Sequence, residues 1–133
     1  MHYSEILALI GLGLGALMGL GALFVPNWAA GVVRLQPDPE RPGGYSEFRA
    51  TYGGLLLLLH MTAFVLVLHA PAAMGLAAAL PIAAGWFGAA MGRTFSMLLD
   101  RGKGGEAKII PIWMATEIAL GLAIAAPILQ FTT

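Results

Sequence analysis

Long stretches without any charged residue are the feature that most restricts how this chain can fold. Residues 6–25 contain no Asp, Glu, Lys or Arg, and neither do residues 50–92. A helix needs about 20 mostly apolar residues to cross the hydrocarbon core of a bilayer. The longer stretch therefore has room for two crossings, and Pro71 provides a break between them.

These stretches predict an all-α integral membrane protein, an up-and-down bundle of four transmembrane helices that forms a single domain. The four predicted spans are residues 5–25, 45–69, 72–99 and 110–131. A short interfacial helix is predicted after the first span, at residues 27–35, where Trp28 would anchor at the lipid headgroups.

Composition agrees with a membrane protein and excludes several classes of function. Only 11% of the residues are charged, whereas a soluble domain usually carries about 25%. The net charge is zero and no basic run is present, so no nucleic-acid partner is expected. The absence of cysteine excludes disulfides and thiolate chemistry. No catalytic motif and no metal-binding motif is present.

The positive charges predict the orientation in the membrane. When the chain is threaded up and down, every Lys and Arg falls on one side, and Lys and Arg concentrate in cytoplasmic loops. Loops 26–44 and 100–109 are therefore predicted to be cytoplasmic, with both termini on the opposite side. The residues concerned are Arg34, Arg41, Arg49, Arg93, Arg101, Lys103 and Lys108.

Glycines recur along the first span at a spacing that places them on one helix face. Gly11, Gly15 and Gly19 lie four residues apart, and small-xxx-small repeats let membrane helices approach closely. This face is predicted either to pack inside the bundle or to contact a partner membrane protein or a second copy of the chain. The other glycines predicted to pack helices are Gly53, Gly54, Gly88 and Gly92.

Two charged residues of opposite sign lie within the predicted spans. Arg93 and Glu117 each lie six residues inside their spans, which is a depth of about 9 Å from the same side. We predict that they meet, because charges inside a membrane are costly unless paired. A wider polar cluster, structural or binding, is predicted on the cytoplasmic side. Its members are Glu47, Arg49, Tyr52, Arg93, Asp100 and Glu117.

His60 lies near the middle of the second span. It is a possible ligand for a haem or a chlorophyll-type pigment, but no second histidine accompanies it at ligand spacing. The simpler interpretation is a hydrogen-bonded histidine inside the bundle, and no cofactor is predicted.

The polar residues also form a recognisable pattern. Residues 47–54 read E-F-R-A-T-Y-G-G, and they are followed by Gly92-Arg93, by Leu98-Leu99-Asp100 and by Glu117. Nearly the whole chain resembles a family of small bacterial four-helix membrane proteins catalogued as a domain of unknown function. The resemblance implies four spans in a bacterial inner membrane and supplies no activity, and His60 lies outside the pattern. It implies that the shared polar set is Glu47, Arg49, Tyr52, Gly53, Gly54, Arg93, Asp100 and Glu117.

Three functions are compatible with these features. The small size, the glycine-lined first span and the lack of catalytic motifs favour a non-enzymatic accessory, assembly or stabilising subunit of a larger membrane complex. The alternative is a binder or carrier of a lipid or other small hydrophobic molecule, which Arg49, Arg93 and Glu117 would hold. A membrane enzyme that uses Glu117 or Asp100 as acid or base is a third hypothesis.

Overall fold

The computed structural model describes residues 1–40, 43–100 and 108–131, and every regular element within these ranges is a helix. Four stretches are long and apolar enough to cross a membrane, with mean hydropathies between 1.5 and 2.3. The predicted all-α fold with four spans is therefore confirmed. The observed spans, close to the predicted ones, are Tyr3–Phe24, Gly44–His69, Ala72–Leu99 and Ile110–Phe131.

Two of the spans are single α-helices and two are composite. Helix α1 (Tyr3–Phe24) forms the first span and α5 (Ala72–Leu99) forms the third. The second span joins α3 (Gly44–Glu47), the π-helix η1 (Phe48–Leu55) and α4 (Leu56–His69). The fourth span joins α6 (Ile110–Ala125) to the 3-10 helix η2 (Ala126–Phe131).

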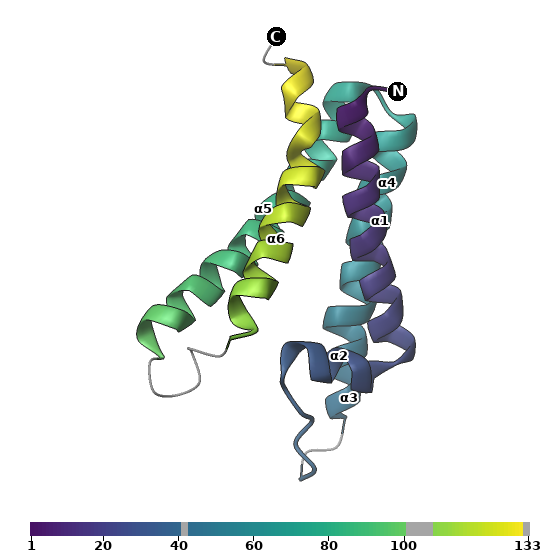
Figure 1. Cartoon of the computed structure of the whole chain (residues 1–133). Coiled ribbons are helices and arrows are strands. Elements are labelled where there is room, and N and C mark those ends of the chain that lie inside the picture. The colour runs from purple at the N-terminus through teal and green to yellow at the C-terminus, as the bar shows by residue number, and fades with distance from the viewer. Residues whose placement is uncertain (41–42, 101–107, 132–133) are drawn as a thin grey trace.

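The spans pack as a ring. Helix α1 contacts α4, α4 contacts α5, α5 contacts α6, and α6 returns to α1. Figure 1 shows that the helices alternate in direction, so the chain begins and ends at the same end of the bundle. Toward the opposite end, the α5–α6 pair diverges from the α1–α4 pair. The candidate site lies between these two pairs.

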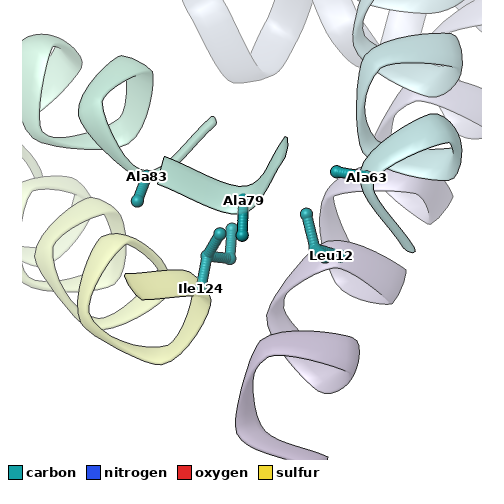
Figure 2. Packing of buried hydrophobic residues seen from close by; sticks show 5 residues of the cluster. All are labelled: Leu12, Ala63, Ala79, Ala83 and Ile124. Carbon is teal, nitrogen blue, oxygen red and sulfur yellow. The ribbon is translucent and has the colours of Figure 1, made fainter. Parts of the chain in front are cut away.

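Small side chains form the core where the four helices approach each other. The central cluster has one leucine and one isoleucine, and its other members are alanines. Figure 2 shows Leu12 and Ile124 pointing toward each other from α1 and α6, with the alanines of α4 and α5 around them. Alanine allows close backbone approach, and the tight contact supplies dispersion energy in place of the hydrophobic effect. The cluster is Leu12, Ala63, Ala79, Ala83 and Ile124.

The glycine face of α1 packs inside this bundle. A Cβ atom on Gly11 would lie 2.7 Å from Cγ1 of Ile124, and one on Gly19 would lie 2.5 Å from the backbone nitrogen of Leu57. On Gly15 it would overlap the imidazole of His60. The first of the two predicted roles for this face is therefore the one observed, and these glycines do not form a free surface.

The remaining predicted packing glycines behave differently from one another. Gly53 lies against α1, where an added Cβ would be 2.9 Å from Cα of Leu23. The prediction was wrong for Gly88 and Gly92, because an added Cβ would meet no atom of the described chain within 4 Å. Gly54 would meet only the backbone oxygen of Arg49, at 3.7 Å. Glycine spacing alone does not distinguish a packed helix face from one directed away from the bundle.

The predicted short helix after the first span is present as α2 (Pro26–Val33), with Pro26 in its first turn. Ala29 and Ala30 of this helix are buried against Ala22 of α1 and Phe48 of η1. The helix ends at Arg34, which adopts a left-handed backbone conformation with a φ angle of 58°. Helix α2 therefore packs on the same end of the bundle as η1.

Candidate functional site

Arg93 of α5 and Glu117 of α6 form the ion pair that the sequence predicts. Nε of Arg93 donates to Oε1 of Glu117 over 2.7 Å. The carboxylate side is almost fully buried, whereas about a third of the Arg93 side chain is exposed, with fractions of 5% and 33%. The pair thus joins the last two spans, and its positive member extends toward the bundle surface.

The second oxygen of this carboxylate differs from the first in its hydrogen bonding. Among the residues that the structure describes, no donor lies within hydrogen-bonding distance of Oε2 of Glu117. An ionised carboxylate accepts hydrogen bonds at both oxygens, and a buried acceptor without a donor carries a free-energy penalty. Glu117 therefore has an unfilled requirement for a donor in its immediate surroundings.

A second polar pair lies deeper in the bundle. Nε1 of Trp86 donates to Nε2 of His60 over 3.0 Å, and Nδ1 of His60 lies 2.8 Å from the backbone oxygen of Leu56. Because Nε2 accepts, the proton of the neutral imidazole lies on Nδ1 and is donated to that carbonyl. Both ring nitrogens of His60 are thus engaged.

The hydrogen bonds of His60 affect whether this residue could bind the metal of a haem or a pigment. A haem or pigment metal would need the Nε2 lone pair, which already accepts the proton of Trp86. Metal ligation through His60 would therefore break this hydrogen bond between α4 and α5. In the described ranges, no group of three or more His, Cys, Asp or Glu side chains is placed to hold a metal ion.

Both pairs line one cavity of about 540 Å³ between the α1–α4 and α5–α6 pairs. Most of its walls are aliphatic or aromatic, and the ion pair supplies the charged groups. Volumes of 300–1,000 Å³ with few polar groups are typical of small-molecule sites. The lining residues are Met18, Val32, Val33, Leu35, Tyr52, Leu55, Leu56, Leu59, His60, Pro81, Ile82, Gly85, Trp86, Ala89, Arg93, Trp113, Thr116 and Glu117.

The second span reaches this cavity through its irregular part. Tyr52 and Leu55 belong to the π-helix η1, and Tyr52 also stacks on Phe48 with ring centroids 5.7 Å apart. π-Helical segments within longer helices are rare and frequently lie at functional sites. Tyr52 is thus the second-span member of the predicted polar cluster that joins Arg93 and Glu117 at the cavity.

The other predicted polar residues lie elsewhere. Arg49 donates from Nε to the backbone oxygen of Leu23 over 3.1 Å and lines a separate hollow at the loop end of the bundle. Glu47 is exposed. Asp100 ends α5 and accepts from the hydroxyl of Ser96 over 2.8 Å. The predicted pocket of Arg49, Arg93 and Glu117 was therefore wrong in Arg49, because that side chain is held against the end of α1.

Trp86 and Gly85 line the cavity but are not among the site residues predicted from sequence. Trp86 precedes Arg93 by seven residues and so lies on the same helix face. That spacing was the available signal for a shared site. Gly85 lines the cavity, and an added Cβ there would meet no atom of the described residues within 4 Å. No sequence signal distinguishes it from Gly88.

In comparisons with known proteins, no family model, no curated protein and no solved structure matches this chain. The resemblance to a bacterial family of unknown function therefore stays a prediction from the residue pattern.

Proposed function

We propose that this protein binds a small hydrophobic molecule within the membrane, in the cavity between its two helix pairs. The observation that carries the proposal is the buried Glu117 carboxylate, which lines a largely apolar cavity of about 540 Å³ and has one oxygen without a donor among the described residues. Ionisable residues inside a membrane are rare and commonly mark binding sites or transport pathways. A bound molecule would bury its body against the walls and supply the missing donor.

A purely structural role for the ion pair would explain fewer of these observations. Interhelical polar contacts in membranes are individually modest, about 0.6 kcal/mol on average in one protein. A structural link needs close packing around it, whereas this pair opens onto a cavity. The binding function accounts for both the pair and the space beside it.

The accessory-subunit function loses one of the three features that motivated it. The glycine face of α1 was its expected contact surface, and Gly11, Gly15 and Gly19 are covered by residues of the same chain. A partner would have to contact a different face. The acid–base enzyme hypothesis gains no support either, because Asp100 does not line the cavity with Glu117.

We also propose the inner membrane of a bacterium as the location, with both termini in the periplasm. The bacterial assignment rests on the sequence resemblance, and the orientation rests on the positive charges. Of the Lys and Arg residues within the described ranges, Arg34 ends α2, Arg49 lies in η1, Arg93 lies near the end of α5 and Lys108 precedes α6. Figure 1 shows α2 and α3 at the end of the bundle opposite the termini, which supports this orientation. Arg41, Arg101 and Lys103 lie outside the described residues.

The binding proposal is tested with a pair of matched glycine variants. The protein is extracted gently from its own membrane, and molecules that remain bound are identified by native mass spectrometry. In Gly85→Leu the new side chain enters the cavity and takes up part of its space, whereas Gly88 does not line the cavity. At both positions an added Cβ would meet no atom of the described residues within 4 Å. We expect wild type and Gly88→Leu to retain a defined small molecule that Gly85→Leu has lost.

Equal retention in all three proteins would place the bound molecule outside this cavity. Stoichiometric association with another polypeptide, with no small molecule bound, would favour the accessory subunit instead.

A further inference from the structure

The polar end of the cavity restricts the kind of head group that a ligand can carry. We propose that the cavity selects an uncharged amphipathic molecule with a hydroxyl head, which donates to Oε2 of Glu117 and accepts from the Arg93 guanidinium. This inference rests on the proposed binding function and specifies its ligand class. It follows from three properties of the site: net charge, hydrogen-bonding capacity and wall chemistry.

The first property is the net charge of the polar end. Arg93 and Glu117 are 2.7 Å apart, so their charges compensate each other. An anionic head near Arg93 would also be near Glu117, and a cationic head near Glu117 would also be near Arg93. Moving an anionic or a cationic head from water into this apolar space carries a desolvation cost. An ion pair of zero net charge offsets that cost poorly. A neutral head avoids that cost.

The second property is the set of unfilled hydrogen bonds. Within the described part of the chain, Oε2 of Glu117 has no donor. The guanidinium of Arg93 carries five N–H donors, and among the described residues its hydrogen bond to Glu117 uses only Nε. A hydroxyl supplies one donor and accepts in return, as a water molecule would. An ester or ketone oxygen only accepts, so it would leave Oε2 without a partner.

The third property is the apolar wall beyond the ion pair. Leu55, Leu59 and Ile82 contribute aliphatic surface, and Trp86 and Trp113 contribute aromatic surface. The apolar body of the ligand would lie here with its hydroxyl directed at Glu117. Long-chain alcohols, acylglycerols and quinols share this chemistry of an apolar body with a hydroxyl head.

Probes of twelve carbons separate the head group from the body. They are 1-dodecanol, 4-hexylphenol, dodecanoate, dodecylammonium and dodecane, each titrated at neutral pH into the purified protein. Trp86 and Trp113 line the cavity and Trp28 does not, so the Trp28→Phe variant gives indole emission from the cavity. Excitation at the red edge of indole absorption avoids the phenol.

We expect at least one of the two hydroxyl probes to bind about tenfold or more tightly than dodecanoate, dodecylammonium and dodecane. A difference of this size is typical of a hydrogen bond to a charged group. Tighter binding of 4-hexylphenol would assign a ring-bearing ligand such as a quinol, and tighter binding of dodecanol an aliphatic one. Tightest binding of dodecanoate or dodecylammonium would overturn the hydroxyl head. Equal binding of all five probes would overturn it too while leaving the binding function intact, whereas binding of none would overturn both.

A double variant tests whether the ion pair recognises the head group of the ligand. Arg93→Gln combined with Glu117→Gln removes both charges and leaves no uncompensated ion, so the bundle is expected to fold. In this background the preference for hydroxyl probes over dodecane should fall to about threefold or less. An unchanged preference would show that other residues select the hydroxyl. If the double variant does not fold, the comparison of the five probes in the protein with the intact ion pair still tests the inference.

Discussion

The imidazole of His60 lies directly against the backbone of Gly15, where a Cβ atom at position 15 would come within 2.1 Å of its Cδ2 atom. Hydrogen bonds to Trp86 and to the Leu56 carbonyl hold this ring on both sides. Moving the ring aside would therefore strain or break at least one of these hydrogen bonds. One contact thus links α1, α4 and α5 at the wall of the cavity.

Substitution of Gly15 by alanine should destabilise the protein strongly. Its methyl group would force the imidazole to shift, and overpacking of this kind costs about 1–3 kcal/mol. Gly88→Ala is the matched control, because the added methyl meets no atom of the described residues within 4 Å. The gain in helix propensity from glycine to alanine, up to about 1 kcal/mol, is common to both variants. Thermal unfolding in mild detergent measures both. Equal stability of the two variants would contradict the close contact.

The two members of the ion pair should respond unequally to removal of their charges. Arg93→Gln leaves a buried carboxylate without its cation, whereas Glu117→Gln leaves an arginine that is a third exposed and can extend to the interface. We expect the first change to lower the free energy of unfolding by about 2–4 kcal/mol and the second by about 1 kcal/mol. The double variant should recover most of the loss. Denaturant titration of all four proteins measures the cycle, and purely additive losses would show that the two groups do not interact.

Orientation can be tested directly because the chain contains no cysteine. Single cysteines replace Tyr3, near the start of α1, and Glu40, in the first connection, both of which are exposed. A membrane-impermeant maleimide should label the Tyr3→Cys protein in cells whose outer membrane is permeable to the reagent. The Glu40→Cys protein should react only after the inner membrane is opened. The reverse result would invert the proposed topology.

The spans and the Arg93–Glu117 pair could be predicted from sequence for simple reasons. Long uncharged stretches have few structural solutions, and two opposite charges at equal depth on consecutive helices have one obvious partner each. Both predictions depend on position along a helix axis, which residue counting supplies. The structure confirms the ion pair and the four spans, with span boundaries that differ from the predicted ones by at most two residues.

The rest of the site depends on how each helix is rotated about its own axis, and this rotation is harder to predict from sequence. Arg49 shares a stripe with Tyr52 and His60 on an ideal α-helix. Arg49 and Tyr52 lie within the π-helical stretch η1, so this ideal spacing does not hold there. The structure places Arg49 against Leu23 while Tyr52 and His60 line the cavity. The hydrogen bond between Trp86 and His60 likewise depends on the relative rotation of α4 and α5.

The link between Arg93 and Glu117 also has a consequence for biogenesis. Each of the last two spans carries a charge that opposes its own transfer into lipid, and on an insertion scale an Arg at a helix centre costs about 2.5–3.5 kcal/mol. Only when both helices are present does each charge meet its counterion. The translocation machinery would therefore release α5 and α6 most easily together, as a hairpin, after the first two helices have already partitioned into the bilayer.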